Sequence, residues 1–223
     1  ELLIEKVAIV MQSENSHFLY LANEFARQFN STEGLITDQY DLQTNKQGYL
    51  QILQSIQRKD PELLYLPVDM QQLFKIQIAL QQLDWYPEIM VSDGIFEDIK
   101  MQKADSLTMV DKVLFIDAFS HDMEFTHLGE QLLEQMAAMG MGLMDLGVSS
   151  ALGMEAYVLL MQVMNDCIVE ENQRDCINNG IRSITKFRGI KGLISFHGTG
   201  KAHRSLSINR IKGDVTEFVV QVY

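Results

Sequence analysis

Residues 189–223 read GIKGLISFHGTGKAHRSLSINRIKGDVTEFVVQVY, and this closing stretch decides the fold. It begins with a short apolar run that predicts a strand. A glycine-rich tight turn follows at Gly198–Gly200. Two further segments then alternate apolar and polar residues, which is typical of half-buried strands. The chain is therefore predicted to end in three closely spaced strands.

The first half of the chain alternates predicted strands with predicted helices. Short apolar runs predict strands, and apolar residues three or four positions apart predict helices. The predicted strands are Lys6–Met11, Leu35–Tyr40, Glu62–Val68, Glu88–Val91 and Lys112–Ala118. The predicted helices are Phe18–Phe29, Tyr49–Ile56, Gln71–Leu83 and Ile95–Lys100. Alternation through short connections predicts an α/β fold, a parallel doubly wound sheet with helices on both faces.

The pattern changes after Ala118. Longer helical runs follow at Leu128–Ala138, Ser149–Asp166 and Arg174–Lys186. The methionine-rich stretch Met136–Met144 is apolar and suits packing against a second surface or a partner. A helical block with one buried face needs a sheet to cover, and this block has little strand of its own.

The end and the beginning of the chain resemble the same family. Gly192–Gly200 follows the pattern G-x-I-x-F-x-x-x-G and is similar to the closing segment of the type I periplasmic binding proteins, the branched-chain amino-acid receptor group. Residues 5–29 resemble the strand and helix that open the second lobe of that family. The resemblance implies a fragment that starts at the second lobe. By this resemblance, we expect residues 1–118, completed by 203–223, to form lobe two, and residues 119–202 to be a helical segment that belongs to lobe one.

The resemblance implies a function as well as a fold. It implies a non-enzymatic, extracytoplasmic solute-binding domain, in which two lobes close over a small polar ligand such as an amino acid. The implied partners are that small-molecule ligand and a membrane permease of ABC-type uptake or a receptor. The implied location is periplasmic or extracellular.

Departures from the family pattern weaken the transfer of the amino-acid function to this chain. His17 and Phe18 stand where many members have a Tyr-Gly pair after the first strand. Met154-Glu155-Ala156 replaces a typical Tyr-Asp-Ala pattern. The altered loop at His17 and Phe18 and the methionine-rich stretch favour a scaffold or regulatory interaction module of the same fold without a working pocket.

The charge of the chain excludes some partners. The formal net charge is −12 and the isoelectric point is near 4.8, whereas a nucleic-acid-binding protein needs a cationic surface. The same charge disfavours anionic membranes. No apolar run reaches the length of about 18 residues that spans a bilayer. The first residue is Glu, so we expect a mature or trimmed chain.

The chain has two cysteines, Cys167 and Cys176, nine positions apart. In an oxidising compartment they could join two consecutive helices by a disulfide, and in the cytosol they would be free thiols. The spacing alone does not decide between these alternatives, because a disulfide requires a specific geometry.

Ligands of open parallel sheets bind outside the carboxyl ends of the strands. Four polar residues that follow predicted strands are therefore candidate ligand contacts: Ser13, Asp69, Ser92 and Asp93. Asp93 falls where amino-acid-binding members of the resembling family carry an acidic residue that pairs with the ligand's ammonium group. The alternative for Asp93 is a helix N-cap, since Asp-Gly is common at strand–helix turns.

Other motifs do not support enzyme chemistry. Gly198-Thr199-Gly200-Lys201 lacks the first glycine and the final hydroxyl residue of a phosphate loop, and a hairpin turn is the better interpretation. His121, His127, Asp117 and Asp122 do not follow a zinc-binding spacing. No nucleophile elbow occurs. We therefore expect no catalytic residues, no metal and no cofactor.

Overall fold

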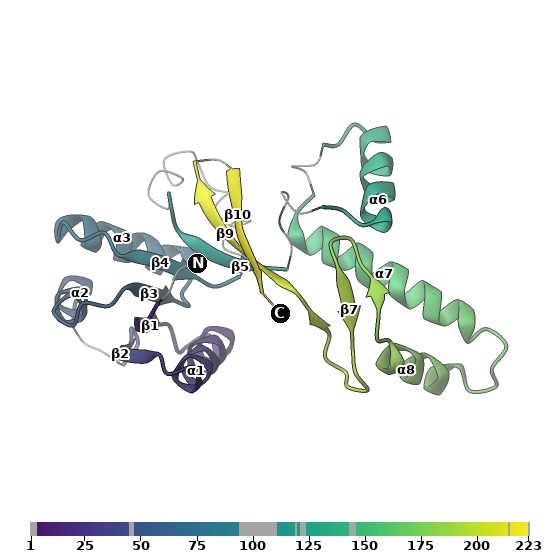
Figure 1. The fold of residues 1–223 in the computed structure, drawn as a ribbon, viewed down its shortest axis with the longest axis horizontal. Coiled ribbons are helices and arrows are strands. Elements are labelled where there is room, and N and C mark those ends of the chain that lie inside the picture. Colours follow the sequence, from purple (N-terminus) through teal and green to yellow (C-terminus); the bar gives the residue numbers. More distant parts are fainter. Residues whose placement is uncertain are drawn as a thin grey trace. The chain divides into compact units, whose positions relative to one another are not determined.

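The computed structural model describes residues 4–44, 47–93, 111–118, 120, 124–142, 146–213 and 215–222. The chain divides into two compact units (Figure 1). The first unit contains Glu1–Ile116 and Asn209–Glu217, and the second contains Asp117–Ile208 and Phe218–Tyr223. The strands β9 (Leu206–Lys212) and β10 (Val215–Val222) contribute residues to both units. The sequence analysis assigned residues 203–223 to lobe two, and these residues are divided between the two compact units. The assignment of the units to lobes stays a prediction.

The first unit is built on a parallel sheet. Its strands are β1 (Lys6–Met11), β2 (Leu35–Asp41), β3 (Leu63–Leu66), β4 (Glu88–Val91) and β5 (Leu114–Asp117). The order across the seven-stranded sheet is β10-β9-β5-β4-β3-β1-β2, and the pairs β1–β2, β1–β3, β3–β4 and β4–β5 are parallel. The predicted α/β class and parallel sheet are confirmed.

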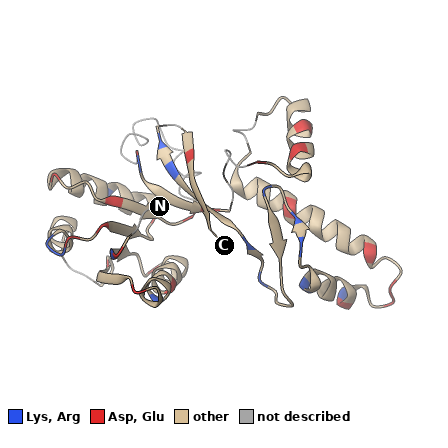
Figure 2. Ribbon diagram, in the orientation of Figure 1, with Lys and Arg blue, Asp and Glu red and all other residues tan. Residues whose placement is uncertain are grey.

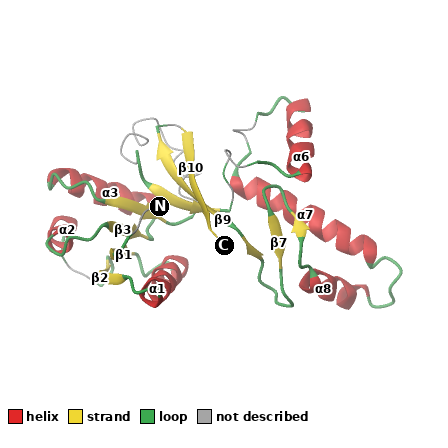
Figure 3. Cartoon of the chain, viewed as in Figure 1, coloured by secondary structure: helices red, strands yellow, loops and turns green. Residues whose placement is uncertain are grey.

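Helices cover both faces of this sheet (Figure 3). The buried side chains of α2 (Tyr49–Gln57) and α3 (Met70–Gln82) form one core with Ala8 of β1 and Leu64 of β3. On the other face, the Phe25 ring of α1 (Ser16–Ser31) stacks on Tyr65, with 4.3 Å between the ring centroids. Side chains alternate between the faces of a strand, so Leu64 and Tyr65 point to opposite helical layers. The sheet is therefore doubly wound, as the sequence predicted.

Short polar residues begin the first and third helices. The Asn15 side chain accepts a hydrogen bond from the backbone N–H of His17 and caps α1. The Asp69 side chain accepts one from the N–H of Gln72 and caps α3. Such caps pair backbone donors that a helix leaves unsatisfied in its first turn. The predicted helix Ile95–Lys100 lies outside the described residues.

The second unit combines three helices with a small antiparallel sheet. The helices are α6 (His127–Ala138), α7 (Val148–Asp166) and α8 (Gln173–Ser183). The sheet has the order β6-β7-β8, with β6 at Phe187–Arg188, β7 at Leu193–Ser195 and β8 at His203–Arg204. Because Ser195 pairs with His203 in antiparallel strands, the segment between them is a hairpin, as predicted. The helical block thus has a sheet of its own. Its strand β7 lies in the apolar run that predicted a strand, whereas β6 and β8 have two residues each, too few for a pattern to predict them.

A buried ion pair holds the second unit together. Glu155 of α7 is 3% exposed, and its Oε2 accepts a hydrogen bond of 2.7 Å from Arg204 of β8. Its Oε1 accepts one of 2.6 Å from the N–H of Ile190, between β6 and β7. The Arg204 guanidinium also donates to the carbonyl of Ala118. A Cβ added at Gly189 would lie 2.3 Å from Glu155 Oε1, so the close approach requires glycine there.

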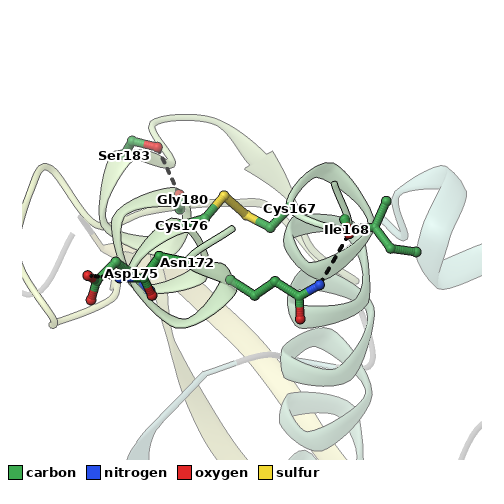
Figure 4. Close-up of a disulfide and its surroundings, with 8 residues drawn as sticks. Cys167, Ile168, Asn172, Asp175, Cys176, Gly180 and Ser183 are labelled. Atoms are coloured by element: carbon green, nitrogen blue, oxygen red, sulfur yellow. Dashed lines mark hydrogen bonds between the residues drawn. A yellow bond between two sulfur atoms is a disulfide. The ribbon is translucent and has the colours of Figure 1, made fainter. Parts of the chain in front are cut away.

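A disulfide joins the end of α7 to the first turns of α8 (Figure 4). Cys167 and Cys176 have Cα atoms 5.9 Å apart, and Cys167 is buried. The connecting loop is also tied by polar contacts: Gln173 donates to the carbonyl of Ile168, and Asn172 caps α8 at Asp175. Of the two alternatives left open by the sequence, the structure has the bonded one.

Replacing both Cys167 and Cys176 by Ala is expected to destabilise the protein by about 2–3 kcal/mol, because the crosslink restricts the unfolded chain. Thermal unfolding followed by circular dichroism measures the change. The control is the native protein in reductant, which should unfold at the same temperature as the double variant. Identical unfolding temperatures for the oxidised protein and the double variant would contradict a formed disulfide.

Candidate functional site

The carboxyl ends of β1, β3 and β4 meet at one edge of the parallel sheet. All four candidate residues lie just beyond these strands: Ser13 after β1, Asp69 after β3, and Ser92 and Asp93 after β4. Parallel pairing aligns Ile9 with Tyr65 and Tyr65 with Met90, so the three strands end at the same level. We call this set of strand ends, with the first turn of α1, the carboxyl edge.

Asp93 is in contact with His17 across this edge. The Nε2 atom of His17 lies 3.0 Å from Oδ1 of Asp93, and the two side chains are 53% and 54% exposed. The imidazole comes from the first turn of α1, whereas the carboxylate follows β4. The Asp93 carboxylate is therefore held in place while still accessible to a solute.

Ser92 lies next to Asp93 and differs from it in exposure. Its side chain is 2% exposed, and its hydroxyl has no hydrogen-bond partner among the described residues. A buried hydroxyl without a partner is unfavourable, since it has lost its hydrogen bonds to water. The hydroxyl of Ser92 is thus a buried polar group next to Asp93 that has no partner among the described residues.

Tyr65 of β3 is buried, and it lies close enough to Asp93 to be affected by its charge. Its burial raises the pKa of the phenol to about 12, and the negative charge of Asp93 adds to the increase. The phenol therefore keeps its proton at neutral pH. Since Phe25 stacks on the same ring, the sheet and α1 together hold Tyr65 in place.

Ser13 is engaged with the neighbouring strand. Its hydroxyl donates to Asp41 at 2.7 Å, and its backbone N–H donates to the same carboxylate at 3.2 Å. Partial burial alone would raise the pKa of Asp41, but the hydrogen bonds from Ser13 and from the N–H of Gln43 outweigh it and lower that pKa below its ordinary value. A pocket of about 620 Å³ lies beside Asp41, lined by Met11, Gln39, Tyr40, Asp41 and Thr44.

Asp69 is engaged as well. Its Oδ1 accepts the N–H of Gln72 as the cap of α3, and its own N–H donates to the Gln12 side chain at 3.2 Å. The edge thus holds two kinds of polar group. Asp93 and Ser92 have capacity for further bonds, whereas Ser13 and Asp69 already bond to the protein.

Comparison with solved structures shows which fold this chain has. A leucine binding protein from Thermotoga maritima superposes with a TM-score of 0.76 at 19% identity, over 98% of this chain and 61% of that one. This chain has the fold of the type I periplasmic binding proteins. The resemblance noted in the sequence is thereby confirmed for the fold.

Two further structures with this periplasmic-binding fold are similar. A branched-chain amino acid transporter substrate binding protein from Streptococcus pneumoniae, in complex with isoleucine, has a TM-score of 0.68 at 17% identity, over 97% of this chain and 60% of that chain. A solute binding protein of an ABC transporter from R. palustris, in complex with benzoate, has a TM-score of 0.70 at 11% identity, over 98% and 58%. No family profile and no curated protein matches the chain. The chain spans about three fifths of the length of these solved structures.

Outside the carboxyl edge, the described residues form few other candidate sites for binding or catalysis. They contain no cluster of three or more His, Cys, Asp or Glu side chains that could hold a metal. None of the described helices has both the length and the apolar character needed to cross a membrane. A pocket of about 670 Å³ in the second unit lies between α7, α8 and the segment Ile184–Arg188.

The sequence analysis did not identify three side chains of the carboxyl edge. His17 was noted only as a departure from the family pattern, Tyr65 was interpreted only as a strand residue, and Asp41 lies just beyond the predicted strand Leu35–Tyr40. Strand alternation could have indicated Tyr65, because it precedes the end of β3 on the face that α1 covers. The contact between His17 and Asp93 joins residues 76 positions apart, and no local pattern indicates it.

Ser13→Ala is expected to destabilise the protein by about 1 kcal/mol at neutral pH, because a hydrogen bond to a charged group is lost. The pKa of Asp41 is lower in the folded than in the unfolded chain, so this stabilisation is present above the unfolded pKa and is lost as pH falls through the folded pKa. Urea unfolding from pH 7 to pH 3 measures the difference. It should shrink toward the acid end, whereas the difference caused by Ser31→Ala, whose hydroxyl donates to the Gln28 carbonyl, should not. A difference for Ser13→Ala that is constant with pH would contradict the Ser13–Asp41 bond.

Proposed function

We propose that this protein is a non-enzymatic solute-binding domain that binds a small polar ligand, an amino acid, at the carboxyl edge. The observation that carries the proposal is the half-exposed carboxylate of Asp93 beside the buried, unpartnered hydroxyl of Ser92. The similarity to solute-binding proteins of ABC transporters supports it. The partner would be a membrane permease or a receptor, and the location periplasmic or extracellular.

The two groups suit an amino acid for separate reasons. A carboxylate that accepts a hydrogen bond from an ammonium group forms a charge-assisted pair, which is about twice as strong as a neutral hydrogen bond. The Ser92 hydroxyl can donate or accept a hydrogen bond, so it adds directionality at the wall of the site. We assign Ser13 and Asp69 a supporting part, since their bonds to Asp41 and Gln72 fix the loops that follow β1 and β3.

Isothermal titration with a panel of amino acids, including L-leucine and L-isoleucine, tests the proposal. At least one should bind, and Asp93→Asn should weaken it by about tenfold or more, because a charge-assisted hydrogen bond is lost. Asp84→Asn is the matched control, since Asp84 is exposed and lies in the turn before β4, away from its carboxyl end. If no member of the panel binds, or if both variants behave alike, the proposal is wrong.

A second candidate function is an interaction module of the same fold. The exposed face of α7 favours it: Tyr157, Met161 and Met164 are 60%, 47% and 44% exposed, and the helix carries only two charged residues, Glu155 and Asp166 (Figure 2). A helix that is apolar all round is normally covered. In the neighbouring methionine-rich stretch, Met139 is also exposed, and part of that stretch lies outside the described residues.

Sedimentation velocity over a range of concentrations tests this second candidate. An interaction surface that binds a second copy gives a concentration-dependent dimer, and Tyr157→Glu should dissociate it. Tyr20→Glu is the matched control, because Tyr20 of α1 is equally exposed, at 60%. A monomer at every concentration would rule out self-association through α7.

A further inference from the structure

The carboxylate on which the proposed function depends already has a partner within the protein. His17 reaches Asp93 at 3.0 Å from the first turn of α1. Its backbone is fixed there, because its N–H donates to the Asn15 cap at 2.9 Å. The contact therefore depends on the cap geometry of α1 as well as on the imidazole.

Among the described residues, Asp93 is the only acidic group within ion-pair distance of His17. The other acidic side chains at the carboxyl edge differ in their surroundings. Asp41 is bonded to Ser13 and Asp69 to Gln72, while Glu14 is exposed in the loop before α1. His17 is thus paired with the carboxylate that lies next to Ser92, and Asp41 and Asp69 are already bonded to other groups.

The pair is weak enough to be displaced. Both side chains are more than half exposed, and exposed ion pairs contribute at most about 1 kcal/mol. A solute ammonium group could take the place of the imidazole at the half-exposed Asp93 carboxylate. A solute that pairs with Asp93 must break the His17–Asp93 contact. The small free energy of that contact therefore reduces the affinity of every such solute.

We propose that His17 is a specificity-determining residue of the carboxyl edge: it occupies Asp93, so a solute with an ammonium group must displace it and a solute without one need not. This inference rests on the proposed function. It makes His17 an internal competitor for amino acids, and it shifts the preference of the site toward solutes that lack an amine.

Titration calorimetry with two probes of the same hydrocarbon skeleton tests the inference. L-leucine carries an ammonium group, and 4-methylpentanoate does not. His17→Ala should bind L-leucine about two- to fivefold more tightly than the native protein, as expected for the loss of an exposed pair. The affinity for 4-methylpentanoate should stay the same. His127→Ala is the matched control, because His127 is an exposed histidine of α6, and it should change neither affinity.

The possible results separate this inference from the proposed function. If His17→Ala weakens both probes, the imidazole contacts the solute and does not compete with it, which overturns the inference alone. If it changes neither affinity, the inference is also overturned while solute binding stands. If neither probe binds the native protein or His17→Ala, the proposed function fails for this class of solute, and the inference fails with it.

Discussion

The parallel pairing of β1, β3 and β4 is the constraint on which the rest of the first unit depends. Parallel strands end at a common edge, and here that edge collects residues from positions 13 to 93 of the chain. Burial on both faces fixes the pairing, since all four residues of β3 are buried. A shift of the register would exchange the faces of Leu64 and Tyr65.

The second unit depends on a different interaction. Glu155 is buried, and both of its oxygens accept hydrogen bonds, from Arg204 and from Ile190. A buried carboxylate is tolerated only where it is paired and hydrogen-bonded. The pair therefore specifies how α7 packs on the small antiparallel sheet. It leaves the opposite, apolar face of α7 exposed, which is the observation behind the second candidate function.

The sequence predicted the elements better than the contacts. The strands β1 and β4 have the predicted bounds, because their apolar runs are short, continuous and bounded by polar residues. The strands β6 and β8 have two residues each, too few for any periodic pattern. The positions of Asp93 and Ser92 at a strand end were predictable from topology. Their difference in exposure and the His17 contact were not, because they arise from packing between segments far apart in the chain.

The most direct test of the central claim, that the carboxyl edge binds a solute, is a map of backbone amide chemical shifts on addition of L-leucine. The account predicts that the changes concentrate at Ser13, His17, Ser92 and Asp93. It predicts no change at Asp84 or Tyr86, which precede β4 at the other end of the sheet. Changes confined to the second unit, around the pocket between α7 and α8, would contradict the account.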